Sequence, residues 1–402
     1  MRRCILFWLL TCCPGILLWT AERVARGEDA GNQLQIQVQT IARGEPEWEW
    51  RQARTELLPA SHHMALTIMS RTKPIGSHGY HDVFYSLTSN AGQTWSSPEV
   101  IPSLVRTRLD DEADRVVGDL WPIRHPQSGT LLVTGKIFIF EQGTKENYRR
   151  EQIAYAVYDP AQNTWGRLQT LQLPPADHEG HPFTAANSGC NQPVCLANGQ
   201  ILLPIRYQKN SKKRIYTSTV VRCSFDGKQL RYLEHGSEHT LDSDRGLYEP
   251  SLIKHQERYY LTLRADRGAY VARSRDGLNF NDQHPWRFDD QQLLGSENTQ
   301  QHWMALGDQL FLVYTRRGAE NDRVFRQRAP LFVAQVDPGQ LCVIRSSEQI
   351  VFPNDGGLYG NFGVCNVSKN EAWITCADDG GKRTRNPQHL NEVLLARMTR
   401  SR

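Results

Sequence analysis

The chain has 402 residues and a formal net charge of +4, so it is long enough to bury a large core. A charge this close to neutral is not typical of a nucleic-acid-binding protein, and we expect no nucleic-acid partner. After the N-terminal segment, no apolar stretch is long enough to cross a bilayer.

The chain begins like an exported protein. Met1, Arg2 and Arg3 precede the apolar run CILFWLLTCCPGILLWT, and a charged start before an apolar core is typical of a secretory signal peptide. We assign residues 1–27 to this signal and expect a secreted or periplasmic protein without stable membrane insertion. An uncleaved anchor or a lipidated N-terminus is the alternative. Residues 28–45 are expected to form an N-terminal leader or the first strand, LQIQVQTI.

Short strand-like runs recur along the rest of the chain. They alternate or are β-branched, they end at Gly, Asn, Asp or Pro, and capped helical segments are nearly absent. Examples in chain order are HDVFYSLTS, TLLVTGKIFIF, QILLPIRY, RYYLTLRA and QLFLVYTRR, with NEVLLARM as a candidate closing strand. Many short strands in succession predict an all-β sandwich, barrel or propeller.

Four similar turns distinguish between these options. They are TSNAGQTW, YDPAQNTW, CSFDGKQL and RSRDGLNF, and each follows a strand-like run. In such turns Asp or Asn accepts backbone N–H bonds and Gly supplies a positive φ, so we interpret them as folding devices rather than catalytic residues. Because a propeller blade takes roughly 40–60 residues, six blades fit best, in a single β-propeller domain over residues 46–402.

Cysteine and histidine spacing gives little support for a metal site. None of the cysteines forms a C-x-x-C pair, and the Cys190–Cys195 spacing suits a small disulfide loop in an exported protein. His178, Glu179 and His181 resemble metal ligands, but no carboxylate cluster accompanies them, and a solvated loop is the preferred interpretation. We therefore expect neither a metal nor another cofactor.

The turns, the strand rhythm and the segment YEPSLIKHQERYYLTLRAD resemble the sialidase (neuraminidase) superfamily, in particular its bacterial Asp-box (BNR-repeat) proteins. The resemblance implies a six-bladed propeller with its site at the mouth of the central channel. The family clamps a substrate carboxylate with three arginines and uses an Asp acid/base and a Tyr–Glu nucleophile pair. A guanidinium fork grips a carboxylate through two bonds, and a neutral Tyr attacks an anionic sugar without charge repulsion.

The resemblance assigns three candidate catalytic residues. Glu249, in YEPSL, opens a strand-like run and takes the position of the family's Glu. Tyr359, in GGLYGNFG, precedes a late strand as the family's Tyr does, with Tyr248 as its rival. Asp82, in GSHGYHD, lies between the first Arg and the first Asp box, and the two histidines of this segment are alternative proton donors.

Arginines at strand ends and polar residues before strands are assigned to substrate binding. A propeller brings such positions to one face, where guanidinium groups hold a carboxylate and amide or imidazole groups bind hydroxyls. The candidates are Arg71, Arg264, Arg316, Arg328, His302 and Asp119.

The expected function is hydrolysis of a terminal anionic sugar by an exo-acting enzyme, with exo-α-sialidase as the named activity. Two alternatives stay open. One is a polysaccharide lyase or another glycosidase on the same scaffold, in which Tyr or His removes the C5 proton of a uronate. The other is a non-catalytic carbohydrate-binding propeller. The expected partner is a sialoside or a uronate-containing glycan in each case.

Overall fold

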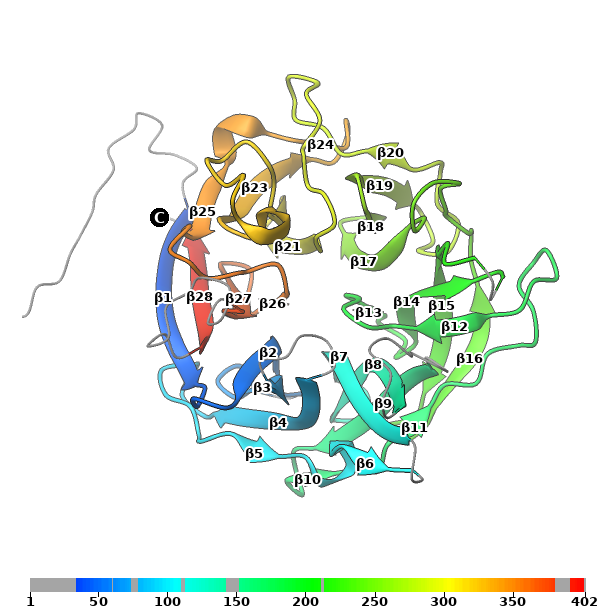
Figure 1. Ribbon diagram of the computed structural model, residues 1–402, viewed down its shortest axis with the longest axis vertical. Helices are drawn as coiled ribbons and strands as arrows, with labels where there is room; N and C mark the ends of the chain where they lie inside the picture. Colours follow the sequence, from blue (N-terminus) through cyan, green and yellow to red (C-terminus); the bar gives the residue numbers. More distant parts are fainter. Residues whose placement is uncertain are drawn as a thin grey trace, which may run out of the picture.

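Six antiparallel sheets surround a common axis as the blades of a propeller (Figure 1). The computed structural model describes residues 34–59, 61–73, 79–109, 113–141, 152–210, 213–379 and 391–400. The segment assigned to the signal peptide, residues 1–27, lies outside these ranges, as does His78. Each blade has one strand near the axis, and its other strands lie farther out toward the rim.

The first blade contains β2 (Glu49–Leu57), β3 (Ala65–Thr72), β4 (Tyr80–Thr88) and β5 (Glu99–Val100). The second blade contains β6 (Thr107–Arg108), β7 (Ala113–His125), β8 (Thr130–Glu141), β9 (Gln152–Asp159), β10 (Thr164–Trp165) and β11 (Gln169–Thr170). The third blade contains β12 (Thr184–Asn187), β13 (Val194–Cys195), β14 (Ile201–Gln208), β15 (Thr217–Phe225) and β16 (Leu230–His235).

The fourth blade contains β17 (Tyr248–His255), β18 (Arg258–Ala265), β19 (Gly268–Ser274) and β20 (His284–Pro285). The fifth blade contains β21 (His302–Leu306), β22 (Gln309–Tyr314), β23 (Leu331–Asp337), β24 (Cys342–Val343) and β25 (Gln349–Phe352). The sixth blade contains β26 (Phe362–Asn366), β27 (Glu371–Ala377), β28 (Glu392–Arg400) and β1 (Leu34–Arg43). Short 3-10 helices occur at η2 (Pro102–Leu104), η3 (Phe325–Gln327) and η4 (Arg345–Ser347). Within the described ranges, no helix is both long and apolar enough to span a membrane.

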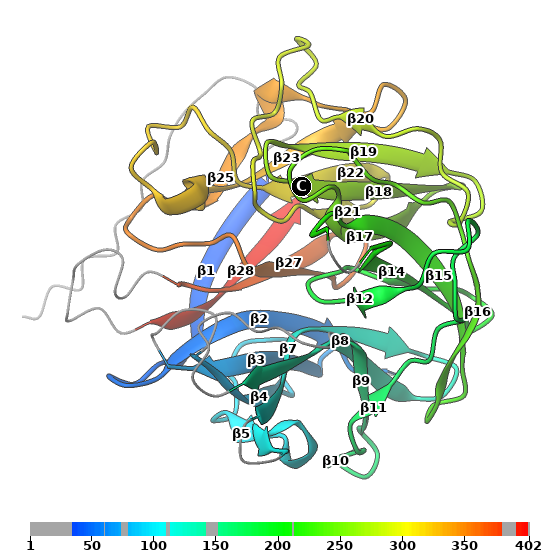
Figure 2. The same ribbon diagram turned by 45° about the vertical axis from the view of Figure 1, so that its right-hand side comes forward.

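The sixth blade closes the ring. Its outer strand, β1, pairs antiparallel with β28, so the start and the end of the described chain lie side by side (Figures 1 and 2). The run LQIQVQTI is therefore a strand, and NEVLLARM is its partner. Joining the two ends of the chain in one sheet holds the six blades together as a closed ring.

The four repeated turns occupy equivalent places. Each follows the strand that is third from the axis along its sheet, which is β4, β9, β15 or β19. After β19, the Asp276 carboxylate accepts the backbone N–H groups of Leu278 and Asn279 at 2.9 and 2.8 Å. These bonds satisfy backbone donors at a tight turn, which is the folding role that the sequence pattern predicts.

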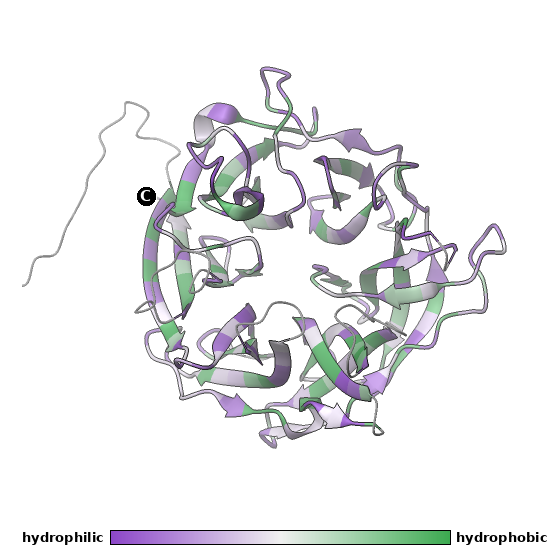
Figure 3. Ribbon diagram, in the orientation of Figure 1, coloured by the Kyte–Doolittle hydropathy of each residue, from purple (hydrophilic) through white to green (hydrophobic). Residues whose placement is uncertain are grey.

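Apolar cores fill the space between neighbouring blades. One core joins Met304 and Leu331 of the fifth blade to Phe362 and Ile374 of the sixth. Hydrophobic residues concentrate on the strands and hydrophilic ones on the connections (Figure 3). The described cysteines are all free thiols, so the expected Cys190–Cys195 bridge does not form. Cys190 instead lies against Gln52, with its Sγ 3.5 Å from the amide oxygen.

In four blades, the strand nearest the axis contains an irregularity that redirects a side chain. Gln52, Asp119, Ala185 and Glu249 have φ values of 55°, 56°, 51° and 48°, and the strand register shifts at each of these positions. A left-handed conformation is unfavourable for a residue with a side chain, and it persists where the surrounding structure stabilises it. Such bulges re-aim side chains next to functional sites. Gln52, Asp119 and Glu249 all reach the cavity described below.

Candidate functional site

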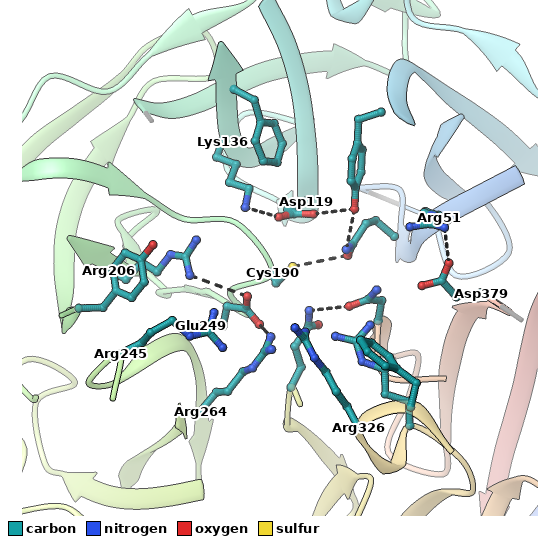
Figure 4. Close-up of a pocket in the computed structure, with 18 of the residues that line it drawn as sticks. Arg51, Asp119, Lys136, Cys190, Arg206, Arg245, Glu249, Arg264, Arg326 and Asp379 are labelled. Carbon is teal, nitrogen blue, oxygen red and sulfur yellow. Dashed lines mark hydrogen bonds and ion pairs between the residues drawn. The ribbon is translucent and has the colours of Figure 1, made fainter. Parts of the chain in front are cut away.

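A cavity of about 300 Å³ lies where the six blades meet, and all six contribute to its lining (Figure 4). Among the described residues that line it, eight are cationic and three carry carboxylates. The cations are Arg51, Lys136, Arg206, Arg214, Arg245, Arg264, Arg326 and Arg328, and the carboxylates are Asp119, Glu249 and Asp379. The surplus of positive charge suits the cavity to an anionic ligand.

Glu249 forms the centre of the cationic cluster. The hairpin of β17 and β18 places Tyr248 opposite Arg264, so Glu249 and Arg264 meet across it, and Arg264 donates Nη1 to the carboxylate. Arg206 Nη1 lies 3.9 Å from the other carboxylate oxygen. Burial acts to raise the pKa of Glu249, but Arg264 and Arg206 outweigh it and hold this pKa at about 2. Glu249 is therefore ionised at neutral pH.

The guanidinium of Arg264 is fixed from a second side. Arg264 Nη2 donates to the backbone oxygen of Asn298 at 2.8 Å and to its side-chain oxygen at 2.6 Å. Arg245 Nη2 donates to the same side-chain oxygen at 2.9 Å, and Arg245 also pairs with Asp266. These contacts hold two guanidinium groups close together despite their like charge, as a preformed anion site requires.

Tyr80, Asp119 and Lys136 form a hydrogen-bonded chain on another wall. Lys136 Nζ lies 2.6 Å from one Asp119 oxygen, and the Tyr80 hydroxyl donates to the other at 3.3 Å. Gln52 Nε2 donates to the Tyr80 hydroxyl at 3.1 Å. Burial and the nearby Asp119 raise the pKa of Tyr80 well above its ordinary value. A phenol held beside a carboxylate whose other oxygen contacts an ammonium has the arrangement of a proton donor or nucleophile with its base.

Arg51 reaches the cavity from β2 and joins the first blade to the sixth. Its Nη2 lies 2.9 Å from Asp379, just after β27, and 3.1 Å from Glu49. The amides of Gln300 and Asn361 meet nearby at 3.1 Å. Guanidinium and amide groups thus alternate around the lining, a combination that can bind a carboxylate and sugar hydroxyls.

Two further arginines of the lining, Arg326 and Arg328, belong to the segment that contains η3. Burial and the charge of Arg264 lower the pKa of Arg328 to about 10. Burial and the charges of Arg264 and Arg245 also lower the pKa of Arg326. Burial is the larger cause of both lowered pKa values, and repulsion among the positive charges adds to it; a bound anion would relieve that repulsion.

The structure brings four of the nine predicted site residues to the cavity: Glu249, Arg264, Arg328 and Asp119. Asp82 is not among the lining residues, although Tyr80, at the start of the same strand β4, is one of them. Asp82 contacts Arg71 at 3.2 Å and His81 at 2.9 Å instead. The predicted acid and the predicted first arginine therefore meet each other outside the cavity.

Tyr359, Arg316 and His302 also have other surroundings. The buried Tyr359 donates its hydroxyl to the exposed Asp355 at 2.5 Å. Arg316 pairs with Glu348 in the fifth blade. His302 is completely buried below the cavity, 2.7 Å from Ser251 Oγ and 3.1 Å from Gln300 Oε1. Tyr248, the rival of Tyr359, is buried and bonds Asp266 at 2.6 Å. Neither Tyr359 nor Tyr248 is among the residues that line the cavity.

Several lining residues have a sequence signal that could have identified them. Lys136 and Arg206 are single cations inside the apolar runs TLLVTGKIFIF and QILLPIRY, where a charge is costly unless it is paired. Tyr80, Arg51 and Asp379 carry no such signal. The described residues contain no group of three His, Cys, Asp or Glu side chains arranged to hold a metal.

Comparison with known proteins identifies the architecture. No known protein-family profile matches the chain, and no curated protein sequence is similar to it. A protein of unknown function from Dyadobacter fermentans superposes with a TM-score of 0.64 at 15% identity, covering 90% of this chain and 99% of that one. A Trypanosoma rangeli sialidase, in complex with 2,3-difluoro-KDN, has a TM-score of 0.61 at 13% identity, covering 87% of this chain and 53% of its own.

The NanB sialidase of Streptococcus pneumoniae has a TM-score of 0.61 at 11% identity, covering 90% of this chain and 70% of its own. This chain spans about half the length of the trypanosomal sialidase. The likeness confirms the predicted fold, an all-β six-bladed propeller arranged as in sialidases.

Proposed function

We propose that this protein is an exported carbohydrate-active enzyme, an exo-acting glycoside hydrolase of the sialidase type that acts on a terminal anionic sugar. The observation that carries the proposal is the cavity in which eight cationic side chains face three carboxylates. Export rests on the signal-like segment 1–27, and we take the turns after the third strands as Asp boxes. The sialidase-like fold supports a carbohydrate ligand in general.

Arg51, Arg264 and Arg328 are the best-placed groups for the carboxylate of such a sugar. They come from three blades, they are all buried to a large extent, and they all line the cavity. Guanidinium groups that converge from several sides can hold both oxygens of a carboxylate in a fixed orientation. This clamp replaces the predicted participation of Arg71 and Arg316.

Tyr80 and Asp119 are the best-placed groups for the chemical step. A neutral hydroxyl can approach an anionic sugar without repulsion, and Asp119 is within reach to take its proton. Lys136 stabilises the ionised form of Asp119 from the other side. Glu249 serves a different purpose in this proposal, because its carboxylate keeps Arg264 and Arg206 in place.

The position of Tyr80 also favours a second candidate, a polysaccharide lyase. In that reaction the arginine cluster would neutralise the carboxylate of a uronate and so acidify its C5 proton. Tyr80, after passing its own proton to Asp119, would take the C5 proton, the C4–O bond would break to leave a C4–C5 double bond, and the leaving oxygen would take up a proton. The observation behind this candidate is that the cavity presents Tyr80, whereas Tyr359 is bonded to Asp355 outside it. The two reactions need the same residues and differ in the product.

A substrate panel separates these candidates. The purified protein is incubated with sialosides and with uronate polysaccharides. Release of free sialic acid indicates a sialidase, and a new ultraviolet absorbance from an unsaturated uronate indicates a lyase. Tyr80→Phe removes the hydroxyl and should abolish turnover in either case, while Tyr359→Phe should retain it. Binding without turnover of any member would contradict both enzymes and leave a carbohydrate-binding propeller.

A further inference from the structure

The cationic side chains that line the cavity lie at two levels, which differ in whether the cations pair with carboxylates of the protein. At the inner level each lining carboxylate already has a cationic neighbour. Glu249 pairs with Arg264, Asp119 lies 2.6 Å from Lys136, and Asp379 lies 2.9 Å from Arg51. These side chains are each at most 12% exposed. The inner level is therefore closed from solvent and partly neutralised by the protein itself.

The outer level consists of Arg326 and Arg214, which are both exposed and both line the cavity. Figure 4 shows the side chain of Arg326 extending toward the centre of the cavity, near Arg264. In the part of the chain that the structure describes, no carboxylate forms an ion pair with Arg326 or Arg214. Arg264 and Arg245 lie close enough to Arg326 for their positive charges to disfavour its own.

The backbone around Arg326 holds the side chain in this unfavourable place. Arg326 and Gln327 both adopt left-handed conformations, with φ values of 53° and 47°, inside the three-residue helix η3. Consecutive left-handed residues with side chains are costly, and strain of this kind concentrates at ligand-binding segments. A solvated surface arginine needs neither this conformation nor the vicinity of two other guanidinium groups.

The size of the cavity indicates which part of the substrate the outer level contacts. The whole cavity, including the part lined by Arg326 and Arg214, has a volume of about 300 Å³, which is at the lower end for ligand pockets, so one sugar ring fills most of it and the exposed arginines lie at its mouth. An exo-acting enzyme holds the terminal sugar inside and leaves the next sugar at the mouth. Arg326 and Arg214 therefore face the second sugar or a substituent that projects outward.

We infer, building on the proposed function, that the substrate is a polyanionic glycan with a second negative charge beyond the terminal carboxylate. Arg326 binds this charge, which is a sulfate ester or a carboxylate on the neighbouring sugar, and Arg214 adds positive charge to the lining of the same cavity. Both groups are oxyanions that accept two hydrogen bonds from a guanidinium fork. A neutral neighbouring sugar leaves the outer level without a partner.

The test is a set of dissociation constants measured by calorimetry at low ionic strength. The probes are sialyllactose, disialyllactose and sulfated sialyllactose, together with a chondroitin disaccharide with and without its sulfate. The wild-type protein should bind the doubly charged member of a series about tenfold more tightly than the singly charged one, as expected for one charge-assisted contact. The sulfated and the carboxylated probes show which oxyanion is preferred.

Arg326→Ala should remove most of this preference, so that the doubly charged probe loses more affinity than the singly charged one. Arg323→Ala is the matched control, because Arg323 is exposed three residues earlier and is not among the lining residues. Equal affinity for singly and doubly charged probes, or a preference that survives Arg326→Ala, overturns the inference alone. Failure to bind any probe overturns the proposed function as well. Tight binding of doubly charged probes without turnover supports the inference and contradicts the hydrolase.

Discussion

Two arginine–carboxylate pairs in this propeller have similar geometry and different surroundings. Arg264 pairs with Glu249 at the axis, and Arg316 pairs with Glu348 in the fifth blade. In the second pair, Glu348 also accepts the hydroxyl of Tyr314 at 2.5 Å, and the Arg316 guanidinium packs over the ring of Phe332 at 4.8 Å. The charges of that pair are balanced, and an aromatic ring covers it.

The axial pair lacks this balance. Glu249 faces Arg264 and Arg206 together, and Arg245, Arg326 and Lys136 line the same cavity. The comparison teaches that an ion pair alone does not indicate a site. An ion pair in a cavity where cations outnumber carboxylates retains the capacity to bind an anion, whereas a balanced pair contributes only to stability.

The largest expected effect is on folding stability in Glu249→Gln. The pKa of Glu249 is held at about 2 against an ordinary value of 4.5, which corresponds to about 3 kcal/mol of stabilisation at neutral pH. Urea denaturation should show a loss of this size. Glu348→Gln, the matched change in the balanced pair, should cost about 1–2 kcal/mol. Equal losses in the two variants would remove the distinction between the pairs.

The lowered pKa of Glu249 predicts that the folding stability of the protein depends on pH. Because the folded-state pKa of Glu249 lies below its ordinary value, the stabilisation is present above about pH 4.5 and is lost as the pH falls toward 2. The difference in unfolding free energy between the wild type and Glu249→Gln should therefore shrink from about 3 kcal/mol at neutral pH to near zero at about pH 2. A difference that stays constant across this range would show that the carboxylate charge is not its cause.

Arg264→Lys should weaken binding of an anionic sugar about ten- to a hundredfold, on the order of 1.5–3 kcal/mol, because an ammonium cannot form the paired contacts of a guanidinium. Isothermal titration with sialic acid and with glucuronic acid measures the change. Retention of wild-type affinity for both sugars would exclude Arg264 from the carboxylate clamp.

Arg316→Lys is the counterpart in the balanced pair. It should lower the unfolding free energy by about 1 kcal/mol through weaker contacts with Glu348 and Phe332. The affinity for anionic sugars should equal that of the wild type. A drop in affinity comparable to that of Arg264→Lys would mean that the fifth-blade pair contributes to the site after all.

The smallest effect is expected for Asp82→Asn. Asp82 meets Arg71 and His81 outside the cavity, and the Arg71 side chain is 29% exposed, so solvent screens the interaction. Thermal unfolding should change by about 0.5 kcal/mol or less in free energy, and turnover of any substrate should be unaffected. Loss of turnover in a folded Asp82→Asn variant would restore Asp82 as the acid.

The blade count and the pair of Glu249 and Arg264 could be predicted because both depend on short stretches of chain. Repeated turns after strands indicate the repeat unit, and one hairpin brings Glu249 and Arg264 together. Arg51 and Asp379 come from opposite ends of the chain, and only ring closure makes them neighbours. Their meeting depends on packing between blades, which local patterns do not reveal.

The other differences between the predicted and the observed site arise from bulges in the strands and from the directions in which side chains point. Asp119 reaches the cavity through a bulge with φ of 56°, and the period-two alternation of a strand does not indicate where a bulge occurs. Tyr359 precedes its strand as expected, but its hydroxyl turns to Asp355. Order along the chain therefore located the elements and did not determine which side chains enter the cavity.

Whether the cavity is built for an anion is measured by the affinity of the wild-type protein for an anionic sugar and for the same sugar made neutral. Sialic acid and its methyl ester form one pair, and glucuronic acid and its methyl ester form another. At least one free acid should bind about tenfold or more tightly than its ester, since charge-assisted contacts are lost on esterification. Added salt should also weaken this binding. Equal affinity for the acid and the ester in both pairs would contradict a site built for an anion.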